Sequence, residues 1–180
     1  MNGIASLLDE HTATLVERVW QDLESHCGLV GVKITPFPHI SWQVTESYEI
    51  SQLDDVLSSF AKQISPFTIH TNGIGLFSSE KPVIYLSIVK DEPLIHFHSM
   101  LWEKTKEIAF HPVLLYSPDW WVPHITIAYN DVTPASLGCA MQYLAFQSFA
   151  WEIQLDNLVL VAQDENQFTH TKTYHFGAKE

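Results

Sequence analysis

Two nearly identical five-residue motifs, 85 residues apart, constrain the fold of this chain more than any other feature. They are Pro38-His39-Ile40-Ser41-Trp42 and Pro123-His124-Ile125-Thr126-Ile127. Successive side chains on a strand point to opposite faces, so each motif places its histidine and its hydroxyl residue on one face and its apolar residues on the other. We therefore expect two strands that each bury one face in a core and present an imidazole and a hydroxyl on the other.

Each motif also opens a similar succession of predicted elements. A helical period follows the motif, and the entry to a later strand, at Phe67 or Phe149, comes 28 or 25 residues after the histidine. No linker rich in glycine, serine or proline separates the two copies. The sequence therefore predicts a single domain over residues 1–180, made of two packed, pseudo-symmetric lobes with a central cleft between them.

Hydrophobic periodicity predicts four helices and eight strand-like segments. The helical stripes cover residues 15–23, 53–64, 94–108 and 137–144, and Thr133 with Pro134 marks the start of the last helix. The strand-like segments are residues 4–8, 39–45, 67–71, 74–78, 82–89, 124–130, 150–161 and 168–176. This pattern indicates an α+β fold in which antiparallel sheets carry helices on their outer faces.

Composition limits the partners that such a chain can have. Its 180 residues include 21 acidic and nine basic side chains, which gives a formal net charge of −12. A surface this acidic repels polyanions at long range, so we expect no binding along a long nucleic-acid tract. No segment approaches the ~20 apolar residues of a membrane span, and residues 4–8 are too short an apolar run for a signal peptide. We expect a cytoplasmic monomer without membrane contact.

Neither the cysteines nor the clustered histidines predict a metal site. Cys27 and Cys139 lie far apart in the sequence and show no zinc-like spacing. For an ordinary soluble domain we expect them to be buried thiols rather than a disulfide. His96 and His98 fall within a helical stripe, where side chains at positions i and i+2 diverge, so they are not expected to share a metal. No metal and no cofactor are predicted.

Together, the two motifs carry the chemical groups that are required for a transfer reaction at a phosphodiester. One neutral imidazole can accept a proton from the attacking oxygen while the other, protonated, donates one to the leaving oxygen. The hydroxyls of Ser41 and Thr126 can donate hydrogen bonds to phosphate oxygens on which charge grows in the transition state. His39, Ser41, His124 and Thr126 are therefore the predicted catalytic residues.

On these motifs, and on the stretch over residues 66–77, the strand over residues 83–89 and the extended C-terminal pair, the chain resembles the two-histidine (2H) phosphoesterase superfamily. Within it the chain is most similar to 2′,5′ RNA ligase-like proteins and cyclic phosphodiesterases. The resemblance implies a two-lobed α+β fold and metal- and ATP-independent opening of cyclic phosphates on nucleotides or RNA ends. It also implies catalytic roles for the two motif histidines and for Ser41 and Thr126, the serine standing where threonine is commoner in the family.

Four further residues are candidates for binding the substrate. Phe37 precedes the first motif, and Trp120 and Trp121 precede the second, so these aromatics can stack a base at the rim of the cleft or fill the seam between the lobes. Lys172 and Lys33 are candidates to offset the charge of the phosphate, although the simpler interpretation of each is a lysine on the protein surface. Tyr129 is expected in the core unless a bulge reverses its strand face.

These observations predict a metal-independent phosphodiesterase that opens a 2′,3′-cyclic or related phosphate on a small nucleotide or an RNA terminus. Two alternatives stay open at this stage. One is ATP-independent 2′,5′ ligation of RNA, and the other is a nucleotide- or RNA-end-binding module without turnover.

Overall fold

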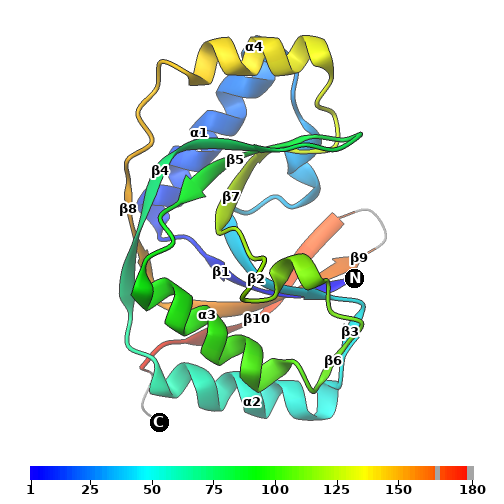
Figure 1. The fold of residues 1–180 in the computed structure, drawn as a ribbon, viewed down its shortest axis with the longest axis vertical. Coiled ribbons are helices and arrows are strands. Elements are labelled where there is room, and N and C mark those ends of the chain that lie inside the picture. Colours follow the sequence, from blue (N-terminus) through cyan, green and yellow to red (C-terminus); the bar gives the residue numbers. More distant parts are fainter. Residues whose placement is uncertain (165–166, 178–180) are drawn as a thin grey trace.

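The computed structural model describes residues 1–164 and 167–177. Along the chain, helices separate single strands or short groups of strands (Figure 1). The strands are β1 (Asn2–Leu7), β2 (His39–Thr45), β3 (Ser47–Tyr48), β4 (Phe67–Phe77), β5 (Val83–Ile88), β6 (Ala109–Phe110), β7 (His124–Ala128), β8 (Glu152–Leu155), β9 (Asn157–Asp164) and β10 (Gln167–His175). The helices are α1 (Glu10–Cys27), α2 (Ile50–Gln63), α3 (Glu92–Thr105) and α4 (Pro134–Leu144), with short 3-10 turns η1 (Gly31–Ile34) and η2 (Leu114–Tyr116).

Two four-stranded antiparallel sheets form the centre of the molecule. Their strand orders are β10-β9-β1-β2 and β7-β5-β4-β8, and β3 pairs separately with β6. Each larger sheet takes strands from both halves of the chain, since β1 and β2 pair in one sheet with β9 and β10. The two lobes are therefore interleaved, and neither predicted repeat builds a sheet by itself.

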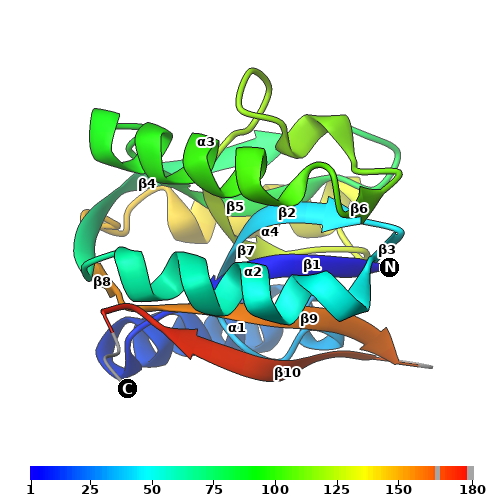
Figure 2. The ribbon, with the colours of Figure 1, turned by 90° about the horizontal axis from the view of Figure 1, so that it is seen from below.

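The helices cover the outer sides of this pair of sheets. In Figure 1, α1 and α4 lie together at the top and α2 and α3 at the bottom, and Figure 2 shows α2 and α3 lying along their sheet. The buried stripe of α1 includes Val16, Val19, Trp20 and Leu23, as the periodicity predicts. Thr133 accepts from the Ser136 amide as the predicted cap of α4. Among the described residues no helix has the length and apolarity to cross a membrane.

Two predicted strand segments differ from the observed strands. The separate segments 67–71 and 74–78 join into β4, whose register with β5 shifts between Thr71 and Ile74, around Gly73 at φ 80°. The single segment 150–161 divides at Asp156, so that β8 lies in one sheet and β9 in the other. A crossover of this kind leaves the hydrophobic alternation nearly intact, so sequence periodicity does not show it.

The expectation of two free thiols is wrong in this structure. Cys27 at the end of α1 forms a disulfide with Cys139 of α4, and their Cα atoms are 5.7 Å apart. The two cysteines meet because α1 and α4 pack side by side. Their separation of 112 residues hides this contact from sequence analysis. Disulfides persist mainly in oxidising compartments, so this cross-link does not support the expected cytoplasmic location.

Candidate active site

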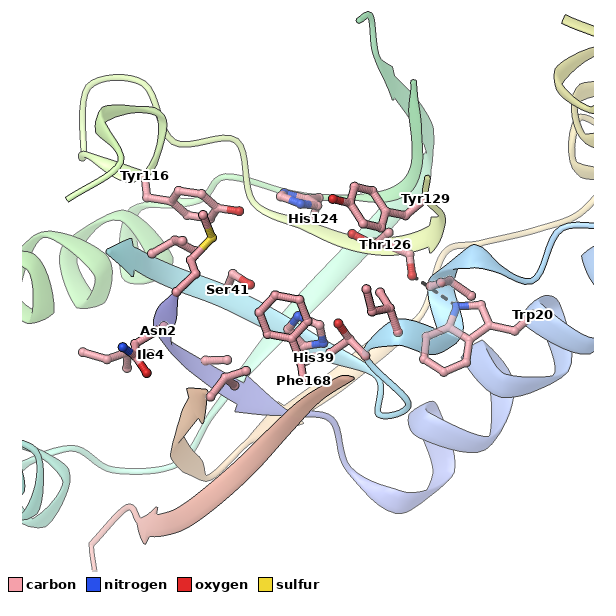
Figure 3. A pocket seen from close by; sticks show the side chains of 18 residues that line it. Asn2, Ile4, Trp20, His39, Ser41, Tyr116, His124, Thr126, Tyr129 and Phe168 are labelled. Atoms are coloured by element: carbon pink, nitrogen blue, oxygen red, sulfur yellow. Dashed lines mark hydrogen bonds between the residues drawn. The ribbon is translucent and has the colours of Figure 1, made fainter. Parts of the chain in front are cut away.

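The two motif strands are edge strands of different sheets and lie next to each other across a cleft. The cleft has a volume of about 230 Å³ and is lined by both motif histidines, Ser41 and Thr126 (Figure 3). The alternating apolar residues of both motifs are buried, as predicted: Ile40, Trp42, Ile125 and Ile127 are each at most 1% exposed. The structure therefore brings the four predicted catalytic residues to one site.

Both histidines are held in the same orientation by the backbone just ahead of them. The Nδ1 atom of His39 lies 2.9 Å from the carbonyl oxygen of Phe37, and Nδ1 of His124 lies 2.7 Å from that of Val122. A carbonyl oxygen can only accept, so each Nδ1 carries the proton and donates it. In the neutral ring, Nε2 then keeps its lone pair for the cleft, as a general base requires.

The surroundings of both imidazoles favour their neutral forms. Burial is the largest cause and lowers the pKa of His39 and of His124, while the carbonyl bond of each ring acts in the opposite direction. The pKa of His39 is lowered further by charge repulsion from His124. Because of this repulsion, a site that holds one proton between its two rings is favoured over one that holds two.

Each motif strand carries a bulge directly after its hydroxyl residue. In β2, Ser41 pairs with Ala5 and Gln43 with Ile4, so Trp42 is the extra residue. In β7, Thr126 pairs with Tyr85 and Ala128 with Ile84, so Ile127 is the extra residue. The bulges bend both edge strands at equivalent positions of the two motifs, next to the cleft.

A tryptophan side chain holds the carbonyl group of each hydroxyl residue. The indole nitrogen of Trp121 donates to Ser41 O at 3.0 Å, and that of Trp20 donates to Thr126 O at 3.2 Å. Trp121 belongs to the loop before the second motif, so its bond joins the two motifs directly. An edge strand has a neighbouring strand on one side only, so each indole bond gives its backbone a further partner.

Aromatic rings pack against His124 from its own sheet. Phe77 contacts the imidazole edge-on with ring centroids 4.9 Å apart, and Tyr85 contacts it at 5.3 Å. Phe77 and Tyr85 stack on each other at 4.2 Å. Gly75 provides the space for this arrangement, because a Cβ atom there would lie 2.3 Å from Tyr85 Cζ.

The turn η1 forms a further wall of the cleft and is tied to the end of β7. Val32, Ile34 and Thr35 line the cleft. The Asp131 carboxylate accepts from the Val30 and Gly31 amides, both at 2.7 Å. Gly31 lies so close to the residue that follows β7 that a Cβ atom would be 2.0 Å from Tyr129 O.

The alternation rule predicts Tyr129 in the core, and the structure places it in the cleft. The bulge at Ile127 reverses the alternation of β7, so that Ile127 and Ala128 are both buried and Tyr129 is 39% exposed at the cleft. Tyr116 and Phe168 also line the cleft, and Figure 3 shows Tyr116 and Tyr129 on the side of His124 and Phe168 on the side of His39. No motif marks these three residues, because a bulge and a 3-10 turn decide where two of them point.

The other predicted binding residues are distributed differently. Phe37 packs against the His39 ring at 5.3 Å and the His170 ring at 5.0 Å, so it buttresses the site. Trp121 is 2% exposed and packs on Trp42 and His98, filling the seam between the lobes. Trp120 is 70% exposed and does not belong to the cleft lining among the described residues.

Lys172 does not face the candidate site. Its ammonium group is paired with the Asp54 carboxylate of α2, which covers the other side of the sheet. Lys33 is paired with Glu24 at 2.6 Å. Strand alternation could not predict the direction of the Lys172 side chain, because the register of β10 with β9 shifts between His170 and Lys172.

The histidine pair of α3 is separated by the helix, as expected. His98 is buried, and its Nε2 atom lies 2.9 Å from Trp42 O, while His96 is exposed. Within residues 1–164 and 167–177, no group of three or more histidine, cysteine or acidic side chains is arranged to hold a metal ion.

Comparison with known proteins identifies the family. Residues 10–167 match the sequence profile of the 2'-5' RNA ligase superfamily. The chain belongs to that superfamily. A presumed phosphoesterase of Bacillus mycoides (strain KBAB4) is 26% identical over 148 residues, covering 78% of this chain and 79% of its own. A similar protein of Bacillus cereus (strain G9842) is 27% identical over the same length and coverage.

Solved structures agree with this assignment at the level of the fold. The protein TT0787 of Thermus thermophilus superposes with a TM-score of 0.67 at 17% identity, covering 99% of both chains. The E. coli LigT structure, complexed with 3'-AMP, gives a TM-score of 0.58 at 16% identity and covers 97% of this chain and 96% of its own. The predicted α+β fold with two antiparallel sheets is therefore confirmed, and the Bacillus relatives indicate a phosphoesterase of this superfamily.

Proposed function

We propose that this protein is a phosphodiesterase that opens the 2′,3′-cyclic phosphate of a small nucleotide or of an RNA terminus. The observation that carries the proposal is the matched orientation of the two histidines, whose Nδ1 atoms are both engaged by carbonyl oxygens at the i−2 position. A cleft of about 230 Å³ is small for a ligand pocket, which favours one nucleotide unit over a polynucleotide.

The reaction follows from these groups with atoms and charges in balance. The neutral histidine accepts a proton on Nε2 from a water molecule as the water oxygen attacks phosphorus. The bond from phosphorus to the 2′ or 3′ oxygen breaks, and the protonated histidine donates its Nε2 proton to that oxygen. The products are a phosphomonoester and a free hydroxyl, and the total number of protons on the two rings is unchanged.

The hydroxyl groups stabilise the transition state. Ser41 and Thr126 line the same cleft as the imidazoles, and each follows its histidine by two positions on the same strand face. Their O–H groups can donate to the two non-bridging oxygens, where negative charge increases during attack. Tyr116, Tyr129 and Phe168 offer apolar and aromatic surface for the nucleoside.

Binding of a mononucleotide by a structural relative also supports this proposal, since the E. coli LigT structure is a complex with 3'-AMP.

The test is incubation of the purified chain with 2′,3′-cyclic, 3′,5′-cyclic and linear nucleotides, with and without a chelator, followed by chromatography. We expect a monoester from the 2′,3′-cyclic substrates in both conditions. Binding without any product would contradict the proposal and favour a nucleotide-binding module.

A further arm separates hydrolysis from ligation. RNA halves that end in a 2′,3′-cyclic phosphate and a 5′-hydroxyl are offered together, so that the 5′-hydroxyl can replace water as the attacking group. We expect the cyclic phosphate to be opened without a joined product. Joined RNA formed faster than the opened end would assign the site to ligation instead.

A further inference from the structure

In the part of the chain that the structure describes, the cleft lining contains no side chain with a permanent charge. Among the described residues, neither lysine, arginine, aspartate nor glutamate lines it. Its polar side chains are those of Asn2, Thr35, His39, Ser41, Tyr116, His124, Thr126 and Tyr129. A protonated motif histidine is therefore the cationic side chain that this lining offers to a phosphate.

Four lysines lie near the cleft in the sequence or through their contacts, and each bonds a group outside the cleft lining. Lys33 follows a lining residue of η1 but bonds Glu24 of α1. Lys172 lies on β10 with Phe168 but bonds Asp54. Lys90 donates to Trp121 O at 2.9 Å, and Lys81 donates to the Asn130 side chain at 3.0 Å. The side chains that can contact a bound phosphate within the described lining are then those of the histidines, the hydroxyl residues and Asn2.

The balance of charge in the site then depends on the substrate. A cyclic phosphodiester carries one negative charge, which a single imidazolium offsets. A terminal phosphate adds between one and two further negative charges near neutral pH, and the described cleft lining has no cationic side chain left for them. The remainder of the chain, with a net charge of −12, repels these added charges.

We propose that this cleft selects cyclic phosphodiesters with a single negative charge and discriminates against nucleotides that carry a second phosphate. The inference rests on the proposed phosphodiesterase function and specifies its substrate class. The preferred substrate is a nucleoside 2′,3′-cyclic phosphate with a free 5′-hydroxyl. Substrates with a 5′-phosphate, or short oligonucleotides with several phosphates, are opened more slowly.

The first test compares two substrates that differ in one phosphate. They are adenosine 2′,3′-cyclic phosphate and its 5′-phosphorylated derivative, measured as kcat/KM at low and at high ionic strength. We expect a preference of about tenfold or more for the first substrate at 0.01 M salt. The preference should shrink at 1 M salt, because the Debye length falls from about 30 Å to about 3 Å.

Equal kcat/KM values at low salt, or faster opening of the 5′-phosphorylated substrate, would overturn the inference and leave the proposed function intact. Failure to open either substrate would instead contradict the proposed function. A preference that does not change with salt would also overturn the inference, because it would show that shape rather than charge decides between the substrates.

A charge-insertion variant provides a second, independent test. Thr35→Lys adds a cation to the wall of the cleft, and Gln63→Lys adds the same charge on the exposed surface of α2. We expect Thr35→Lys to reduce the preference at least threefold and Gln63→Lys to leave it unchanged. An equal effect of both variants would show that net charge alone acts, which contradicts selection by the cleft. If Thr35→Lys fails to fold, the two-substrate comparison on the unaltered chain still decides.

Discussion

The indole N–H of Trp121 donates to the carbonyl oxygen of Ser41 at 3.0 Å, so a residue of the second motif's loop holds the strand of the first motif. Trp20 makes the equivalent bond to Thr126 O at 3.2 Å. Both bonds lie at the residue that precedes a bulge. The two tryptophans are thus positioning residues that fix the edge strands on which the histidines lie.

Replacing either indole by a benzene ring tests this positioning role. In Trp121→Phe and Trp20→Phe the carbonyl group loses its donor while most of the packing stays. We expect a loss of about 1–3 kcal/mol in the free energy of unfolding and a decrease in kcat of about tenfold with a smaller change in KM, because a misplaced catalytic group weakens the transition state most. Trp151→Phe serves as the control, and a wild-type kcat in both test variants would contradict the role.

The pH dependence of kcat/KM follows from the two lowered histidine pKa values. Catalysis needs one neutral and one protonated ring, so activity falls below the lower pKa, where both are protonated, and above the higher pKa, where both are neutral. Burial lowers both pKa values from 6.5. We therefore expect a bell-shaped profile with its maximum below pH 6.5, and a maximum above pH 7.5 would contradict this account.

Gly75 is expected to matter through the ring that it accommodates. An alanine at this position brings its Cβ atom 2.3 Å from Tyr85 Cζ, so the Tyr85 ring must move away from its contact with His124. We expect Gly75→Ala to lower kcat/KM about tenfold and to destabilise the fold by about 1–3 kcal/mol. The matched control is Gly138→Ala in α4, where a Cβ atom meets nothing within 4 Å. That change should stabilise the helix by about 0.5–1 kcal/mol and leave activity intact.

The disulfide between α1 and α4 is expected to stabilise the fold. It closes a loop with a sequence separation of 112 residues, and such cross-links typically contribute about 2–4 kcal/mol by restricting the unfolded chain. Thermal unfolding with and without reductant should show a lower Tm for the reduced protein, and the Cys27→Ser/Cys139→Ser variant should melt at that lower temperature in both conditions. Two titratable thiols in the native, unreduced protein would exclude the cross-link.

The sequence was sufficient for the parts of the site that local rules control. The proline, histidine and hydroxyl positions of each motif, with strand alternation, place His39 with Ser41 and His124 with Thr126 in one cleft. Helical periodicity likewise predicts where the four helices lie, and Thr133 predicts the start of α4. These features depend on residues a few positions apart, where periodicity is informative.

Long-range contacts explain what the sequence did not predict. The disulfide, the pairing of Lys172 with Asp54, and the passage of the chain from β8 to β9 all depend on which elements pack together. Strand alternation predicts the wrong position for Tyr129 for a different reason. One extra residue at Ile127 reverses every later side chain of the strand, and nothing in the local composition marks that bulge.

The central claim is that His39 and His124 act together on one phosphate. The most direct measurement is kcat for adenosine 2′,3′-cyclic phosphate in His39→Gln, His124→Gln and the double variant, with His175→Gln on the exposed part of β10 as the control. We predict that each single change lowers kcat about 10³-fold and that the double change lowers it little further, because the two groups act as a unit. A wild-type kcat in either single variant would contradict the claim.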